Sequence, residues 1–368
     1  MPSRVENIPT SQKAAVTTVN DDKVSTIIAD IPVPELKSGQ ILVKINWSGL
    51  CYNDVGPMRN FWPGSPRSDT FKQAAHSISG HEGVGNVVAI AEDVALEKLW
   101  NLGDRVGIKW VASVCRKCEF CTNGRDEVNC QQPLYSGLTT PGTFQQYVAT
   151  DARFALRLPD NVSDEEAAPL LCSGLTIYTA TKRSKVQPGQ WIVYLGGGGG
   201  QGHLGIQYAK AMGMRVIAID VGSEKGTFCT SLGADVYIDT SVCNDVTAEV
   251  KKLTEYGAHG VIVVAPSEQA YELAPTLLRP TGTMVVVAFV RDRTYKFGLP
   301  PIFFASSQYN IVGSTTGSRE EAREMFEFTQ KGLVHPTLHK GSLKDVEKYL
   351  DLIIDKKLLG KVVLKVDL

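Results

Sequence analysis

The sequence contains no apolar run long enough to cross a bilayer, no internal repeat and no low-complexity segment. Its 38 basic and 39 acidic side chains leave a net charge of −1, so the composition implies no broad basic surface for nucleic-acid binding. The first residues show no apolar stretch of the kind that secretory signals carry. We therefore predict a cytoplasmic protein without membrane or nucleic-acid partners, and 368 residues are enough for two domains.

Cysteine is scarce, and half of it lies in one short stretch. Eight cysteines are too few for a disulfide scaffold in a chain of this length. Cys115, Cys118, Cys121 and Cys130 can surround one tetrahedral zinc ion and leave no open position, so we predict a structural zinc site. Two disulfides or an iron–sulfur cluster remain as alternatives, because both also use four sulfurs.

The pattern of apolar residues changes near residue 170. Before it, short strand-like segments such as I-L-V-K-I-N-W are separated by glycine, proline and aspartate. After it, apolar runs such as W-I-V-Y-L alternate with helical segments, which indicates a buried parallel sheet. We expect helices near residues 202–212, 224–232, 244–256, 267–278, 318–331 and 343–357. The closing run K-V-V-L-K-V is expected to be a strand that returns to the first domain.

A glycine-rich loop follows the strand W-I-V-Y-L and opens a helix. Gly197, Gly199 and Gly202 satisfy the spacing G-x-G-x-x-G, which allows a tight turn and close approach of a pyrophosphate to the helix N-terminus. Asp220 ends the next strand, where a carboxylate can accept both ribose hydroxyls and repel a 2′-phosphate. We predict NAD in preference to NADP; the alternative for Asp220 is a solvated strand end.

Three further segments carry the resemblance to a known family. They are G-L-C-Y-N-D with Cys51, S-G-H-E-G-V-G with His81, and A-A-P-L-L-C-S-G with Cys172. At these residues the chain resembles the zinc-dependent medium-chain alcohol dehydrogenases, particularly the yeast-like, fungal branch. The resemblance runs nearly end to end, through V-G-I-K-W, G-T-F-Q-Q-Y, Q-Y-A-K-A-M-G and L-G-K-V-V-L.

The resemblance implies an α/β protein of two domains and the activity of an NAD-dependent alcohol dehydrogenase or carbonyl reductase. A GroES-like, β-rich catalytic domain would comprise residues 1–168 and 317–368, and a Rossmann domain with a doubly wound parallel sheet would comprise residues 169–316. We expect a homo-oligomer, a dimer or tetramer, that acts on a small alcohol or carbonyl compound.

The resemblance also implies a catalytic zinc, bound by Cys51, His81 and Cys172 with the fourth position open. Each residue also has a simpler alternative when it is considered alone. Cys172, in A-P-L-L-C, could be a small core residue, and His81 could only cap the glycine-rich turn in which it lies. Glu82 resembles the carboxylate that approaches the metal during ligand exchange, and Asp54 the acceptor that orients His81.

The resemblance assigns further residues to the cofactor and substrate. Lys361 stands where the family has a basic residue near the pyrophosphate, and Lys225 is also assigned to cofactor binding. Val287 and Phe289, at the end of the strand M-V-V-V-A-F, are expected beside the nicotinamide and the substrate.

Two departures from the family pattern affect the expected substrate. The family usually carries threonine or serine at the position of Asn53 and a histidine at the position of Gly56, which together form a proton relay. The segment between Cys51 and His81 is longer than in the yeast-like enzymes. Trp62, Trp110 and Phe289 are expected to form the substrate pocket, and His76 is the candidate replacement proton carrier. The alternatives are a surface loop without substrate contact for the longer segment and a structural histidine for His76.

We therefore predict poor ethanol turnover and a bulkier substrate than ethanol. Reduction of a conjugated enal or enone double bond is the alternative enzymatic function. A non-catalytic dinucleotide-binding sensor or structural protein is the alternative of another class.

Overall fold

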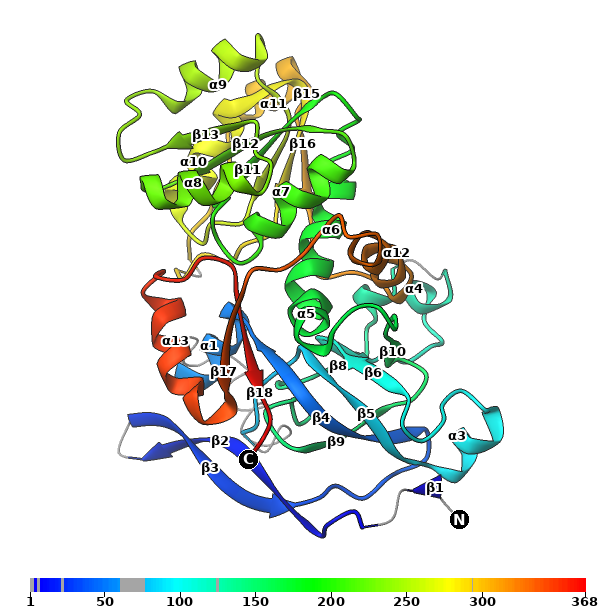
Figure 1. The fold of residues 1–368 in the computed structure, drawn as a ribbon. Coiled ribbons are helices and arrows are strands. Elements are labelled where there is room, and N and C mark those ends of the chain that lie inside the picture. The colour runs from blue at the N-terminus through cyan, green and yellow to red at the C-terminus, as the bar shows by residue number, and fades with distance from the viewer. Residues whose placement is uncertain (1–2, 5–6, 21–22, 60–76, 124–125, 293) are drawn as a thin grey trace. The chain divides into compact units, whose positions relative to one another are not determined.

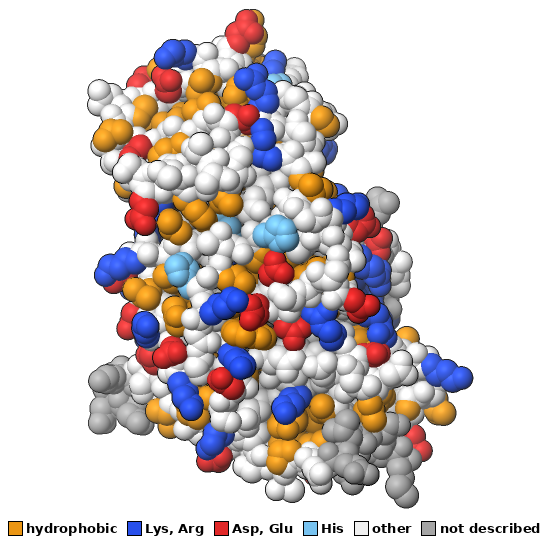
Figure 2. Space-filling view, viewed as in Figure 1, with side chains coloured by type: hydrophobic (Ala, Val, Ile, Leu, Met, Phe, Trp, Pro, Cys, Tyr) orange, Lys and Arg blue, Asp and Glu red, His pale blue; other side chains and the backbone are white. Residues whose placement is uncertain are grey.

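The computed structural model describes residues 3–4, 7–20, 23–59, 77–123, 126–292 and 294–368 (Figure 1). These group into two compact units. We call Met1–Cys172, Ser318–Arg323 and Leu338–Leu368 the β-rich unit, and Ser173–Gly317 and Glu324–Thr337 the α/β unit. No helix among the described residues is both long and apolar enough to span a membrane. Figure 2 shows basic and acidic side chains interspersed on the face in view.

An eight-stranded sheet forms the centre of the β-rich unit. Its main path runs in the order β10 (Leu156–Arg157), β6 (Arg105–Ile108), β5 (Gly83–Ile90), β4 (Gln40–Leu50), β18 (Lys361–Lys365) and β17 (Leu338–Ser342). β1 (Ser3–Arg4) pairs with β5, and β9 (Tyr147–Asp151) pairs with β4. Alternate residues of β4, namely Ile41, Val43 and Ile45, face the main apolar core, as the two-residue period of a strand requires.

Smaller elements complete the β-rich unit. Two further two-stranded sheets pair β2 (Ser11–Asn20) with β3 (Lys23–Pro32) and β7 (Val111–Ser113) with β8 (Leu134–Tyr135). The helices are α1 (Tyr52–Arg59), α3 (Glu92–Glu97), α4 (Glu119–Thr122), α5 (Asp164–Pro169) and α13 (Val346–Ile354). β18 pairs antiparallel with β4, so the closing strand lies in this sheet, as the sequence predicted.

A six-stranded parallel sheet forms the centre of the α/β unit. Its order is β13 (Val236–Asp239), β12 (Arg215–Asp220), β11 (Trp191–Leu195), β14 (Ala258–Val263), β15 (Leu278–Val286) and β16 (Asn310–Gly313). Every residue of β11 is buried, which explains its uninterrupted apolar sequence. β11 separates β12 from β14, so the order of the strands reverses here, and open parallel sheets bind ligands at such a point, outside the strands' carboxyl ends.

Helices connect the strands of this sheet (Figure 1). They are α7 (Gly202–Ala211), α8 (Ser223–Ser231), α9 (Val246–Thr254), α10 (Glu268–Leu273) and α11 (Pro301–Ser307). α6 (Leu175–Arg183) precedes β11, the first of these strands in the chain. α12 (Arg319–Gln330) begins in the β-rich unit and continues in the α/β unit. The predicted α/β class, with a β-rich domain and a parallel-sheet domain, is confirmed.

Candidate metal centres and cofactor loop

Four side chains from three separate segments meet in the β-rich unit. Cys51 directly follows β4, His81 and Glu82 directly precede β5, and Cys172 lies in the π-helical turn Leu170–Gly174. The ligand atoms of these residues all lie within 4.8 Å of one another, and all four side chains are buried. The structure therefore brings together the residues that the resemblance assigns to the catalytic zinc, with Glu82 beside them.

Asp54 holds the imidazole of His81 in place. Its Oδ1 lies 3.0 Å from His81 Nδ1, and its two oxygens also accept the backbone N–H groups of Gly80 at 3.1 Å and Cys51 at 2.9 Å. Burial would lower the pKa of His81, but the Asp54 carboxylate beside it raises that pKa well above its usual range. His81 Nε2 is buried and has no hydrogen-bond partner among the described residues, so this nitrogen is the one available to a ligand.

The donor set fits zinc. The hydrogen bond from the Cys172 thiol, together with the charge of Lys361, lowers the pKa of Cys51 well below its usual value, despite burial. Zinc is bound by thiolate sulfur and by an imidazole nitrogen whose ring is oriented through its other nitrogen, which is the arrangement around His81. Two cysteines and one histidine leave a fourth position for water or substrate.

Glu82 is paired with Lys361, a contact that the sequence pattern does not predict. Lys361 Nζ lies 3.1 Å from Glu82 Oε1 and 3.2 Å from the carbonyl oxygen of Leu50. Burial raises the pKa of Glu82 to about 7, while the charge of Lys361 opposes that shift. A Cβ atom at Gly49 would lie 1.9 Å from Glu82 Oε2, so only glycine fits opposite this carboxylate. The predicted contact of Lys361 with a pyrophosphate stays a prediction.

The predicted substrate-pocket residues have different surroundings. The Trp110 ring meets the His81 ring edge-on at 5.2 Å and stacks on Tyr135 at 4.9 Å. Phe289 is 58% exposed, whereas Val287 is buried. Trp62 and the candidate proton carrier His76 lie outside the described residues. Asn53 and Gly56, the two departures from the relay, both lie on α1.

The second cysteine group also fits a metal ion. The ligand atoms of Cys115, Cys118, Cys121 and Cys130 lie within 4.8 Å of one another. Cys121 Sγ lies 3.5 Å from Cys118 Sγ and 3.9 Å from Cys115 Sγ. Four sulfurs at 2.3 Å from a tetrahedral zinc would be separated by about 3.8 Å. All four thiols are free, so the spacing suits a closed structural zinc site better than disulfides.

The glycine loop follows β11 and leads into α7. A Cβ atom at Gly202 would lie 2.2 Å from the carbonyl oxygen of Gly196, and one at Gly197 would lie 2.8 Å from the Cβ of Ala218. Both positions therefore require glycine for packing. At Gly199 the nearest atom is 3.4 Å away, which leaves space beside the backbone at the amino end of the helix.

Asp220, at the end of β12, lies directly beside this loop. Its Oδ2 accepts the backbone N–H of Gly198 at 3.0 Å, and its Oδ1 accepts from Lys225 Nζ at 2.7 Å. The structure thus brings together the predicted cofactor residues of the α/β unit: Gly197, Gly199, Gly202, Asp220 and Lys225.

Comparison with known proteins shows two family matches along the chain. Residues 37–160 match the family described as "Alcohol dehydrogenase GroES-like domain", and residues 200–331 match the "Zinc-binding dehydrogenase" family. "Alcohol dehydrogenase 2" of Emericella nidulans is 38% identical over 367 residues, covering 97% of this chain and 98% of the relative. "Alcohol dehydrogenase" of Schizosaccharomyces pombe is 37% identical and covers 97% of this chain and 98% of that protein.

Solved structures share the same architecture. The alcohol dehydrogenase of Aeropyrum pernix superposes with a TM-score of 0.82 at 27% identity, covering 96% of this chain and all of that one. Acetophenone reductase of Geotrichum candidum, solved in complex with NAD, has a TM-score of 0.83 and covers 98% of this chain and 100% of its own. Its identity is 23%, so this likeness concerns the fold alone.

Proposed function

Because the chain belongs to the zinc-dependent medium-chain alcohol dehydrogenases, we propose that it transfers hydride between NAD(H) and an alcohol–carbonyl pair bulkier than ethanol and its aldehyde. The enzymatic class rests on these relatives.

The observation that carries the proposal is the set of Cys51, His81 and Cys172 around a common point, with His81 Nε2 directed away from Asp54. When bound, zinc polarises the oxygen of an alcohol or carbonyl compound and stabilises negative charge on it. A non-catalytic dinucleotide-binding protein has no use for such an incomplete ligand set. The geometry therefore favours the enzyme over the sensor or structural protein.

Asp54 and Lys361 act on the groups around the metal position. Asp54 accepts the Nδ1 proton of His81, which fixes the tautomer and keeps Nε2 available as a donor atom. Lys361 holds Glu82 at the site by an ion pair at 3.1 Å. If Cys51, His81 and Cys172 hold the metal, Glu82 would supply a further carboxylate oxygen beside it.

The α/β unit binds the cofactor in this proposal. The space at Gly199 and the N-terminus of α7 suit a pyrophosphate, since backbone N–H groups and the helix dipole both favour negative charge. Asp220 would accept the ribose hydroxyls and disfavour a 2′-phosphate, and Lys225 would remain beside it. NAD supplies the hydride chemistry when bound.

The substrate proposal rests on Trp110 and on the two relay positions. An indole edge-on to His81 gives an aromatic surface next to the metal position. Asn53 and Gly56 replace the groups that form the family relay, so proton release during oxidation of a simple alcohol lacks its usual route. Both features support better turnover of an aromatic or otherwise bulky substrate than of ethanol.

We further propose that each chain binds two zinc ions, one at each cysteine-containing group. We also propose that the protein is a homo-oligomer and that it works in the cytoplasm, where thiols stay reduced. Free thiols at both sites require such an environment. The test is metal analysis of the purified protein together with a screen of alcohols, aldehydes and enals with both nicotinamide cofactors. Two zinc ions and NAD-dependent turnover of a bulky alcohol are expected. A single zinc without turnover would favour the binding protein.

A further inference from the structure

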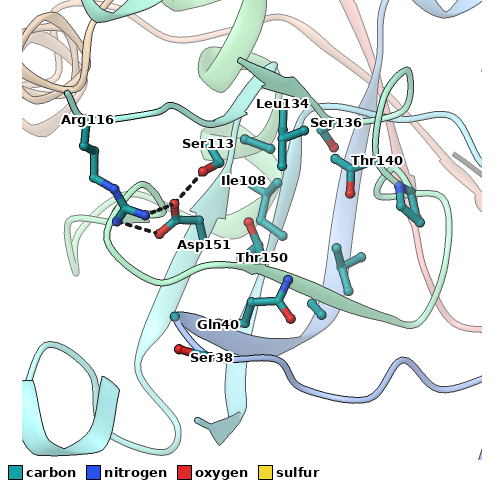
Figure 3. A pocket seen from close by; sticks show the side chains of 15 residues that line it. Ser38, Gln40, Ile108, Ser113, Arg116, Leu134, Ser136, Thr140, Thr150 and Asp151 are labelled. Atoms are coloured by element: carbon teal, nitrogen blue, oxygen red, sulfur yellow. Dashed lines mark hydrogen bonds and ion pairs between the residues drawn. The ribbon is translucent and has the colours of Figure 1, made fainter. Parts of the chain in front are cut away.

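A pocket of about 200 Å³ lies in the β-rich unit (Figure 3). It is lined by residues of the segments around β4, β6, β7, β8 and β9. Gln40, Thr140 and Thr150 supply polar groups to its wall, while Ile108 and Leu134 supply apolar surface. None of the residues assigned above to the metal ions or the cofactor lines it.

The charged groups at this pocket neutralise each other. Asp151 Oδ2 accepts from the Ser113 hydroxyl at 2.5 Å, and Asp151 Oδ1 accepts from the backbone N–H of Arg153 at 3.0 Å. The guanidinium of Arg116 lies 3.3 Å from the same carboxylate. Figure 3 shows this ion pair at the edge of the pocket. A charged ligand would be repelled by whichever member of this ion pair carries the same charge. A neutral hydroxyl group can instead exchange hydrogen bonds with the polar side chains of the wall.

One wall of the pocket is also the support of the candidate catalytic metal centre. Ser136 lines the pocket, and its hydroxyl donates to the carbonyl oxygen of Gly80 at 3.1 Å. The backbone N–H of Gly80 in turn donates to Asp54, which holds His81. The backbone N–H of Ser136 also donates to the carbonyl oxygen of Trp110, whose ring meets His81. A change at Ser136 thus reaches His81 through two short series of contacts.

We propose that this pocket binds a small neutral molecule that carries hydroxyl groups on a compact apolar body, and that its occupation alters turnover through Ser136. The size is adequate, because an apolar cavity of about 150 Å³ is sufficient for benzene. The mixed wall matches such a ligand: the apolar body contacts Ile108 and Leu134, and its hydroxyls reach Thr140 and Gln40. This site is separate from the position of the proposed alcohol substrate.

The probe is pinacol, a compact neutral diol whose carbinol carbons bear no hydrogen, so that no hydride can be removed from them. Binding to the zinc-loaded enzyme is followed by ligand-observed NMR. Saturable binding is expected, and pivalate, a carboxylate of similar shape, should bind at least about tenfold more weakly, since burying an unpaired charge is unfavourable. Equal binding of both compounds would contradict the ligand class.

Ala112→Leu fills the pocket from β7 and should weaken pinacol binding about tenfold or more through overpacking at its wall. Thr140→Leu, at a half-buried position of the wall, is the second variant if Ala112→Leu does not fold. Ala248→Leu, an exposed position on α9, is the matched control and should bind pinacol like the unmodified enzyme. Unchanged binding in the filled variants would overturn the assignment of the site.

Two further variants separate this site from the catalytic one. Cys172→Ser should lose alcohol oxidation yet keep pinacol binding, so loss of binding there would place the probe at the metal centre instead. In the unmodified enzyme, pinacol should change kcat without a matching change in the KM for the alcohol, and Ser136→Ala should retain binding but lose that effect. Ser136→Ala removes the hydroxyl contact with Gly80 and keeps the backbone contact with Trp110, so an identical kinetic effect in this variant would refute the connection to His81 through the Ser136 hydroxyl.

Discussion

At the residue scale, we expect the proposed preference for NAD to depend on one carboxylate, that of Asp220. Asp220 is held by the N–H of Gly198 and by Lys225, so its oxygens are fixed at the edge of the glycine loop. Asp220→Ser removes the negative charge that opposes a 2′-phosphate and leaves Lys225 available to it. The ratio of kcat/KM for NAD over NADP should fall by roughly tenfold to a hundredfold, the range for loss of a hydrogen bond to a charged group.

The control for this prediction is Asp239→Ser, which changes a carboxylate at the end of the neighbouring strand β13. That variant should keep the cofactor ratio of the unmodified enzyme. If the unmodified enzyme used NADPH as well as NADH, the assignment of Asp220 would be wrong.

Asn53 and Gly56 set the expectation for proton release. General acid–base steps typically contribute about 10²–10⁴-fold, so an interrupted relay should limit oxidation of ethanol much more than it limits cofactor binding. Asn53→Thr alone should restore little ethanol activity, because Gly56 still interrupts the relay. Asn53→Thr with Gly56→His should restore more, measured as kcat at neutral pH. Rapid ethanol oxidation by the unmodified enzyme would show that another proton route is sufficient.

The candidate ligands Cys51, His81 and Cys172 followed from the resemblance, because each lies in a segment that resembles the family. The four-cysteine group followed from the spacing of its thiols alone.

The pairing of Glu82 with Lys361 could not be predicted from the sequence, since it depends on the register of β18 against β4, in which Val363 lies opposite Gly49. Gly49 is the one sequence feature that hints at this pair, because a side chain there would collide with Glu82. That reason is visible only once the neighbouring strands are known.

At the scale of elements, the loop of four cysteines and α4 should behave as a separately metal-stabilised element. Closed zinc sites contribute directly to folding energy, whereas an open site mainly supplies chemistry. Cys115→Ser should lose one zinc ion and lower the Tm by about 5 °C, the shift that a loss of roughly 4 kcal/mol produces in a chain of this length. Cys172→Ser should stay folded and lose activity. Metal analysis and thermal denaturation of both variants check this, and identical behaviour would contradict the division into two kinds of site.

A buried lysine lies beside the same element. Lys109 Nζ donates to the carbonyl oxygen of Val111 at 3.2 Å and lies 3.6 Å from the centre of the Phe154 ring. Burial lowers the pKa of Lys109 to about 7; Glu127 opposes that shift and Arg319 adds to it. Glu127 in turn accepts the backbone N–H of Arg319 at 2.7 Å.

This lysine gives the protein a testable pH dependence of stability. The unfolded chain holds the proton of Lys109 up to about pH 10, whereas the folded chain releases it near pH 7, so stability rises with pH between these values. Relative to Lys109→Met, the free energy of unfolding should gain roughly 3 kcal/mol between pH 7 and about pH 9.5. Denaturant titrations at both pH values measure it. A difference that stays constant with pH would show that Lys109 is charged throughout.

Element prediction was most reliable where apolar periodicity was strong. The run W-I-V-Y-L is β11 without an error at either end, and the helix expected at 202–212 is α7. α6 was not predicted, because its sequence L-T-I-Y-T-A-T-K-R is rich in β-branched residues and its first seven residues are all buried, so that no polar face marks a helix. α11 was also missed, since it is short and has no buried face.

At the scale of the whole molecule, the α/β unit presents one apolar edge. β16 is the last strand of its sheet, so one side of its backbone is not paired within the sheet. Ile311 on this strand is 41% exposed, and Ile302 and Phe303 on the preceding helix α11 are 70% and 52% exposed. An edge of this kind suits pairing with the same edge of a second copy, which supports the proposed homo-oligomer.

Ile311→Arg should therefore shift the protein towards monomers, because pairing of this edge with a second copy would have to bury the introduced charge. Sedimentation velocity measures the shift. Leu96→Arg, at an 80% exposed position on α3, is the matched control and should leave the assembly unchanged. An unmodified protein that is monomeric at micromolar concentration would contradict the proposal, as would an Ile311→Arg variant with unaltered assembly.

The position of β18 between β4 and β17 has a consequence for synthesis on the ribosome. All residues of the α/β unit precede Leu338, so every strand of that unit is translated before β17 and β18. On a nascent chain, β4 is present without its neighbour β18, and Glu82 is made long before Lys361. The α/β unit can therefore fold during translation, whereas the sheet that supports the metal ligands closes last.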